Sequence, residues 1–455
     1  MAVWRARSVL ALVGAVLLVS LAAASAEAVP SIPSSAFEPV RNCGCHSSFQ
    51  ETWSRSMHAQ ALSDPIYQYE LGLAIKATDG ALGPFCNSCH GPVAVMSGEI
   101  DGLDLGGLSD AARDAISCDF CHQVTGRVGD KPGNASYALD DPDGTKRAQL
   151  KDAKSPYHVT AYSEFHETAE FCGNCHDVFH PINGLPLEQT YTEWKNGPYA
   201  AEGIVCQDCH MTPGPGVTKP NPGRAAPFGV DRDHIYIMTF AGGNTALGDA
   251  ALAEERLKAA AQVLVDVPVY VEPGATAEVT VTVTNVGAGH YIPTGLTEFR
   301  QMWLEVTLAS DEGTQTIGEH RYGLELGDDE GNHPVPLWEA TNIAKDDRIP
   351  PRESRTYTYE FTMPESGVAD IRAALYYRSV SEEVAHEAGV DVPTTLMADA
   401  GGRVFGSEEI AAEIAQESAG HLTFPGGSFA LWAALVAIVA IVGVVGAAIV
   451  RNRKM

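Results

Sequence analysis

Five pairs of cysteines, each followed directly by a histidine, constrain this chain more than any other feature of its sequence. The pairs are Cys43/Cys45, Cys86/Cys89, Cys118/Cys121, Cys172/Cys175 and Cys206/Cys209, and they use all ten cysteines. The histidines are His46, His90, His122, His176 and His210. Four pairs have the spacing C-x-x-C-H. This is the attachment signature of haem c, in which two thiols bond to the vinyl groups and the adjacent imidazole binds the iron.

Two other uses of paired cysteines, disulfides and zinc sites, explain the pattern less well. Disulfides are common in exported proteins, but disulfide pairing does not place a histidine after each second cysteine. Zinc sites draw four ligands from two pairs and need no histidine at that fixed offset. We therefore expect covalently bound haem c at the four regular motifs.

The first motif, Asn42-Cys43-Gly44-Cys45-His46, has one residue too few between its thiols. Attachment through both thiols would strain this loop, although Gly44 accepts backbone angles that are closed to other residues. Three outcomes are open: a haem with two thioethers, a haem bonded through Cys45 alone, or a free Cys43 thiol. We expect a haem here, which raises the expected number from four to five, because the following sequence looks like that after a regular motif.

A second histidine on the open face of a haem would complete the iron coordination and favour electron transfer. The best candidate is His58, which lies beside the apolar face of a helix predicted to include Trp53 and Met57. The other candidates for distal iron ligands are His158, His166 and His234, and His180 is a weaker one.

The stretch that holds the motifs, residues 40–245, is punctuated by Gly and Pro and has helical periodicity mainly near 50–62 and 64–77. Ordinary apolar packing would hold such a segment poorly. We expect the haems to supply the missing core, so that the chain without haem does not fold, and short connections to keep the irons close together.

A different pattern follows, after a short helix predicted at 252–261. Residues 262–400 alternate apolar and polar side chains between Gly, Pro and Asp turns, which predicts a β-sandwich of immunoglobulin-like type. The predicted strands are 263–267, 277–283, 302–308, 356–361 and 373–377. A spacer or stalk is the simplest role for this domain.

Both ends of the chain are apolar. Residues 1–28 have the layout of a secretory signal peptide. After a linker at 401–426, the span 427–450 is uncharged and long enough to cross a bilayer core of about 30 Å. The tail 451–455 carries Arg451, Arg453 and Lys454, which predicts a cytoplasmic C-terminus and a single-pass protein of the cell membrane, with its bulk outside the cytoplasm. A buried core helix or a removable sorting tail is the alternative.

The expected fold is therefore α+β and multidomain: a haem-packed, mostly helical or irregular lobe, an all-β sandwich and one C-terminal transmembrane helix. The formal charge of −28 argues against nucleic acid as a partner. We expect redox proteins, one of them with a basic docking face, or a quinol-linked donor in the membrane as partners; an oligomer remains open.

The amino-acid sequences in and around the motifs also resemble those of a known family. Segments such as Cys86-Asn87-Ser88-Cys89-His90-Gly91-Pro92 and Val205-Cys206-Gln207-Asp208-Cys209-His210-Met211, and the stretch Trp53 to Ala61, look like the multihaem c-type cytochromes related to the tetrahaem electron acceptor of hydroxylamine oxidoreductase. The resemblance covers residues 40–245 and implies mostly bis-histidine haems in stacked and perpendicular pairs. Gly289 to Gly295 is similar to a segment in the β-domains of such proteins, which makes His290 a further candidate for a haem ligand or a residue of the lobe interface.

Two functions follow as expectations. The first is an electron carrier without a substrate pocket, in which the protein supplies spacing, ligands and electrostatics. The second is an oxidoreductase of the nitrite or hydroxylamine class with one open iron site. Against the second, the chain has no C-x-x-C-K motif; in its favour, the irregular first motif could hold a haem with unusual ligation. A filament-forming cytochrome is a third possibility, which a retained membrane span would make awkward.

Overall fold

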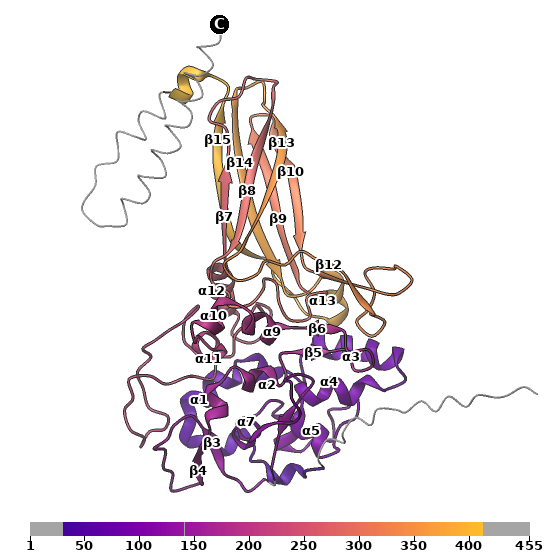
Figure 1. Cartoon of the computed structure of the whole chain (residues 1–455), viewed down its shortest axis with the longest axis vertical. Helices are drawn as coiled ribbons and strands as arrows, with labels where there is room; N and C mark the ends of the chain where they lie inside the picture. The colour runs from indigo at the N-terminus through magenta and orange to yellow at the C-terminus, as the bar shows by residue number, and fades with distance from the viewer. Residues whose placement is uncertain (1–30, 141, 413–455) are drawn as a thin grey trace, which may run out of the picture.

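The computed structural model describes residues 31–140 and 142–412 as two lobes (Figure 1). The N-terminal lobe, up to residue 249, contains short helices joined by irregular segments. Its helices are η1 (Ser34–Ala36), η2 (Val40–Asn42), η3 (Gly44–His46), α1 (Ser47–Ser54), α2 (Met57–Gln60), α3 (Pro65–Ala77), α4 (Leu82–His90), α5 (Pro92–Met96), α6 (Asp110–Arg113), α7 (Cys118–Gln123), η4 (Glu164–Glu167), α8 (Glu170–Gly173), α9 (Thr190–Lys195), α10 (Pro198–Ala201) and α11 (Cys206–His210).

Three small strand pairs complete this lobe. They are β1 (Gly126–Arg127) with β2 (Tyr137–Ala138), β3 (Lys146–Ala148) with β4 (Thr160–Tyr162), and β5 (Val178–Phe179) with β6 (Pro186–Glu188). An apolar cluster that includes Val93, Ala94, Phe120 and Val124 packs α5 against α7 on one side of the lobe.

The helix predicted at 50–62 is broken in two, because Ser56 has extended backbone angles and its side chain caps the next helix. The Ser56 hydroxyl accepts a hydrogen bond from the Ala59 N–H, and α2 therefore begins at Met57. Trp53 is buried at the end of α1, and its indole N–H donates to the carbonyl of Ile116 at 2.9 Å. The predicted helix at 64–77 is present as α3, which Asp64 caps through the Ile66 N–H.

Helix α12 (Ala250–Ala260) joins the lobe to a β-sandwich (Figure 1). Its strands are β7 (Ala261–Asp266), β8 (Thr276–Asn285), β9 (Gln301–Ser310), β10 (Gly313–Tyr322), β13 (Ser354–Thr362), β14 (Val368–Arg378) and β15 (Thr395–Phe405). They form one sheet in the order β10-β9-β14-β15 and another in the order β13-β8-β7. The five period-two segments of the sequence lie in β7, β8, β9, β13 and β14.

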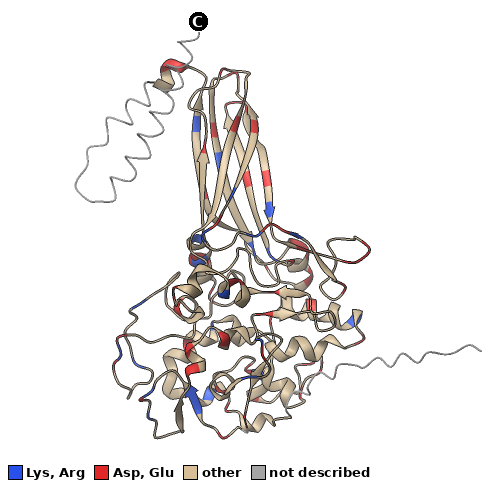
Figure 2. Ribbon diagram, viewed as in Figure 1, with Lys and Arg blue, Asp and Glu red and all other residues tan. Residues whose placement is uncertain are grey.

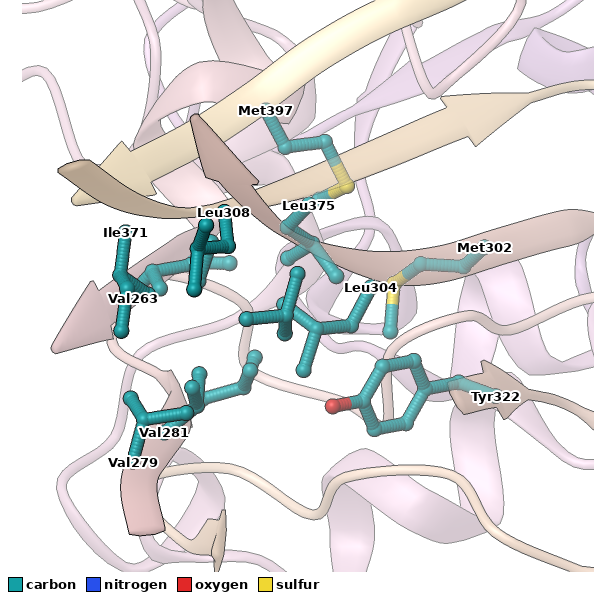
Figure 3. Packing of buried hydrophobic residues seen from close by; sticks show 14 of the residues in the cluster. Val263, Val279, Val281, Met302, Leu304, Leu308, Tyr322, Ile371, Leu375 and Met397 are labelled. Atoms are coloured by element: carbon teal, nitrogen blue, oxygen red, sulfur yellow. The ribbon is translucent and has the colours of Figure 1, made fainter. Parts of the chain in front are cut away.

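Side chains from both sheets meet in the centre of the sandwich (Figure 3). Alternate residues of β9 point inward, so that Leu304 and Leu308 face Val279 and Val281 of β8. All four of these side chains are at most 1% exposed. Because the chain has no cysteines here, this apolar burial is the main source of stability of the sandwich.

The two lobes are in contact at the base of the sandwich. The hairpin of β11 (Leu324–Gly327) and β12 (Asn342–Asp346) packs Leu324 and Leu326 against Leu187 of β6. On another side, helix α13 (Glu382–Ala388) lies against α3, where Ala385 and Val380 pack on Ile66. The sandwich therefore shares apolar contacts with the lobe that carries the motifs.

One part of the expected fold is corrected. Among residues 31–140 and 142–412, no helix is long and apolar enough to cross a membrane. The longest of them, α3, has 13 residues, whereas a bilayer core needs about 20. The fold class ending in a transmembrane helix, and the single-pass localisation derived from it, are therefore not supported. The predicted span 427–450, the tail 451–455 and the signal peptide 1–28 lie outside the described residues.

Replacing Leu304 with Ala should destabilise the sandwich by about 2–5 kcal/mol, because it removes a fully buried side chain and leaves a cavity. Chemical unfolding of the holoprotein, followed by far-ultraviolet circular dichroism, measures this loss. Leu264→Ala on β7 is the control, since Leu264 is 54% exposed and should change the stability by about 0.5 kcal/mol or less. Equal losses in the two variants would contradict the core assignment.

Candidate functional site

One cavity of about 2020 Å³ runs through the N-terminal lobe. This volume is larger than the roughly 300–1,000 Å³ of a pocket for one small ligand. All ten cysteines line it, together with the five motif histidines and with His58, His158, His166, His234 and His290. Of the predicted ligand candidates, only His180 does not line the cavity. The cavity is therefore large enough for several macrocycles, with their attachment residues around it.

The four regular motifs each lie on a helical turn. They belong to α4, α7, α11 and the turn that follows α8, where the His176 N–H donates to the Cys172 carbonyl at 3.0 Å. Residues three and four apart share one face of a helix. Both thiols and the imidazole of each motif can therefore face the same group in the cavity, which fits haem c.

The first motif uses a tighter turn. Residues Gly44–His46 form a 3-10 helix, and the His46 N–H donates to the Cys43 carbonyl at 2.8 Å. A 3-10 helix has three residues per turn, so the shorter motif still closes one turn between its first cysteine and its histidine. Cys43 is half-buried like the eight cysteines of the regular motifs, whereas Cys45 is exposed.

Every motif histidine uses Nδ1 for a hydrogen bond. The acceptors are the carbonyls of Ala225, Ala61, Arg147 and Ala241 for His46, His90, His122 and His210, at 2.6–2.9 Å, and Oε1 of Glu188 for His176, at 3.3 Å. An imidazole that donates from Nδ1 has its lone pair on Nε2, the form that binds a metal. Four backbone carbonyls and the Glu188 carboxylate thus orient the five imidazoles as iron ligands.

Four motif histidines have a second imidazole opposite them. The pairs are His46–His158, His58–His176, His122–His166 and His210–His290, with ring centroids 6.3, 6.3, 6.1 and 6.2 Å apart. A metal–nitrogen bond of about 2 Å on each side, with about 1 Å from each nitrogen to its ring centre, gives a separation of roughly 6 Å. The spacing therefore fits one iron between each pair.

Burial keeps two of the ligand candidates, His58 and His166, neutral. Burial lowers the pKa of His58 to about 3, with smaller contributions from neighbouring histidines. Burial, helped by His122, lowers the pKa of His166 to about 4. Neutral imidazole is the form that coordinates iron. In this structure His166 Nε2 donates to the Cys121 carbonyl at 3.0 Å, a bond that coordination would replace.

The second motif is different. The ring of His90 lies face to face with that of Tyr67, with centroids 3.7 Å apart, and the Tyr67 hydroxyl donates to Asn87 of the same motif. No other described histidine lies opposite His90 at the separation of the four pairs. His421 is outside the described residues. Among the described residues, the motif without a facing imidazole is therefore the second and not the first.

Two candidates do not form such pairs. His234 lines the cavity, but its ring meets Tyr236 edge-on, and its Nδ1 accepts the Asn221 N–H at 3.0 Å. Its Nε2 is shielded from solvent and has no partner among the described residues, so it offers a hydrogen-bond donor to the cavity. His180 is buried, and its Nε2 donates to the Trp338 carbonyl at 3.4 Å.

Thiols of different motifs also meet. Cys43 and Cys118 lie within hydrogen-bonding reach of each other, as do Cys172 and Cys206. The pKa of the Cys175 thiol is raised by its hydrogen bond to Cys89, by burial, and by the nearby thiols of Cys121 and Cys172. The fourth motif therefore lies beside the second, the third and the fifth, and the first lies beside the third.

Comparisons with known proteins bear on the family and the fold. Residues 42–123 match the family described as cytochrome c554 and c-prime. The solved penta-haem cytochrome c552 from Thermochromatium tepidum is 22% identical and superposes with a TM-score of 0.58, covering 82% of this chain and 100% of its own. The CARDB domain of the PF1109 protein from Pyrococcus furiosus is 16% identical, with a TM-score of 0.19 and coverages of 32% and 90%. No curated protein matches the sequence. The resemblance inferred from the motifs is confirmed.

Replacing His158 with Ala should leave one haem without its distal ligand. The ferrous protein should then bind carbon monoxide at one more haem per chain than the unchanged protein, measured by absorbance titration. His180→Ala is the matched control, because His180 is buried outside the cavity. An unchanged carbon monoxide stoichiometry in the His158 variant would mean that another residue occupies the sixth coordination position of that iron.

Replacing Glu188 with Gln should raise the reduction potential of the haem bound by His176. The carboxylate at Nδ1 makes this imidazole a stronger donor and so stabilises ferric iron. The expected rise is on the order of 60 mV, a tenfold change in a one-electron equilibrium. Spectroelectrochemical titration measures it, with Glu51→Gln on the exposed face of α1 as control. A fall in potential would contradict the assignment.

Proposed function

We propose that the chain is a multihaem c-type cytochrome that binds five haems c and relays electrons between redox partners. The observation that carries this proposal is the set of four imidazole pairs with centroids 6.1–6.3 Å apart along one cavity. Two histidines on one iron fill both axial positions, which favours electron transfer over ligand chemistry. The bound haems supply the one-electron chemistry.

The order of the motifs in space supports a continuous path. A thioether sulfur is attached directly to the edge of its macrocycle, so neighbouring thiols place two haem edges side by side. By this criterion the path runs from the first motif to the third, then to the fourth and the fifth. The second motif adjoins only the fourth, through Cys89 and Cys175, and forms a branch.

The protein's own residues tune this path. Glu188 at the His176 imidazole places negative charge beside the fourth motif, which favours the oxidised state there. Arg256 lies beside the His210 imidazole of the fifth motif, and burial lowers the pKa of Arg256 to about 10. A partly buried cation favours the reduced state. Together these charges favour electron flow from the fourth motif toward the fifth.

The partners we propose are other redox proteins with a basic docking face. The chain carries 58 acidic and 30 basic residues, and the acidic side chains are spread over both lobes (Figure 2). Opposite charge on a partner would speed the encounter and make its rate depend on ionic strength.

A second candidate function rests on the His90 haem. Because no described histidine faces His90, this haem is the best candidate for an open coordination position. An open iron next to a chain of electron-supplying haems could reduce small nitrogen compounds of the nitrite or hydroxylamine class. Against this role, the C-x-x-C-K motif that marks the pentahaem nitrite reductases is absent from the sequence.

Intact mass and electron paramagnetic resonance of the holoprotein test both functions. We expect a mass increase of five haems, four low-spin ferric signals and one high-spin signal that belongs to the His90 haem. His90→Ala should remove the high-spin signal and leave the others. A mass increase of four haems would contradict the count, and five low-spin signals would exclude the open position.

A further inference from the structure

A buried ion pair connects the two lobes beside His290. Glu193 of α9 and Arg348, which follows β12, meet at 2.5 Å, and their side chains are only 4% and 5% exposed. Asp346 completes the arrangement, with its carboxylate 2.8 and 2.9 Å from Nε and Nη2 of Arg348. Charges at this depth are costly unless each is paired, so this contact is a strong constraint on how the lobes fit together.

The second carboxylate oxygen of Glu193 binds the segment that carries His290. Oε2 accepts the Tyr291 N–H at 3.1 Å and the Thr294 hydroxyl at 2.7 Å. The Arg348 guanidinium lies over the Tyr291 ring, 5.1 Å from its centroid. One side chain of the N-terminal lobe therefore holds both a cation of the sandwich and the residue that follows His290.

The sandwich fixes His290 from its other side. The His290 carbonyl accepts from Asn285 Nδ2 at 2.9 Å, at the end of β8, and His290 Nδ1 donates to the Tyr291 carbonyl at 2.9 Å. The ring then lies 20° from parallel to that of His210, with centroids 6.2 Å apart. The position of His290 opposite His210 depends on where α9 holds this short segment.

We infer that Glu193 is a positioning residue, which, paired with Arg348, holds His290 of the sandwich on the iron bound by His210. The inference rests on the proposed function, in which His290 is the distal ligand of the fifth haem. It gives the sandwich a role that a spacer would not have: docking of the two lobes completes an iron site. Loss of the docking contact should open that site.

The test uses Glu193→Gln in the full-length holoprotein. An amide has one acceptor oxygen, so its NH₂ group must face either Arg348 or the Tyr291 and Thr294 donors, and one set of contacts is lost. We expect one haem per chain to change from low-spin to high-spin, and the ferrous protein to bind carbon monoxide at one more haem than the unchanged protein. Magnetic circular dichroism and carbon monoxide titration measure these changes.

Glu202→Gln is the matched control. Glu202 and Arg352 also join the two lobes, in a bidentate pair at 2.5 and 2.7 Å, but both side chains are exposed and neither contacts the His290 segment. An exposed pair contributes little to stability. This variant should keep the spin state and the carbon monoxide stoichiometry of the unchanged protein.

His290→Ala separates the two ways in which the inference can fail. If His290→Ala adds a carbon monoxide site and Glu193→Gln does not, His290 is the ligand but the positioning role is wrong. If His290→Ala adds none, the ligand assignment is wrong as well. Should Glu193→Gln fail to retain its haems, Thr294→Val replaces it, because it keeps the ion pair and removes the bonds of the Thr294 hydroxyl to Glu193 and Thr190. Faster carbon monoxide binding then supports the inference, and an unchanged rate overturns it.

Discussion

The N-terminal lobe depends on imidazoles held in pairs about 6 Å apart on either side of a shared metal position. Each pair joins segments that are distant in sequence: α2 to the fourth motif, the end of the β3–β4 connection to the first, η4 to the third, and the sandwich to the fifth. The helices themselves are short, and their apolar cluster occupies one side of the lobe. In the proposed cytochrome, covalent attachment and axial ligation would take the place that a continuous apolar core has in the sandwich.

The haem attachment motifs could be predicted from the sequence, whereas the pairing of each motif with a distal histidine could not. Cysteine spacing and the adjacent histidine define each motif within five residues, and period two defines the strands. Which histidine faces which motif depends on chain folding over long distances, and no local pattern assigns His158 to His46. The helix at 50–62 was predicted as one because its periodicity continues through Ser56, which in fact caps a new helix. Hydropathy alone suggested the transmembrane span.

The residues that tune and position the ligands were also missed. Glu188 and Glu193 look like ordinary polar positions of a strand and a short helix, and their importance appears only when the fold places them beside His176 and the His290 segment. A carboxylate that is buried in the fold has no signature in the sequence that separates it from an exposed one. The sandwich was expected to act as a spacer for the same reason: its contribution comes from one loop between two regular strands.

The fourth motif, with neighbouring thiols from three other motifs, makes the proposed network a junction instead of a line. In a line, each centre can only pass on the charge that it receives. At a junction, the haem on the side arm exchanges electrons with the haems of the main route. It would be reduced while the terminal acceptor is absent and oxidised when the acceptor returns. A branched chain of this kind would keep one electron on the side arm while others pass along the main route.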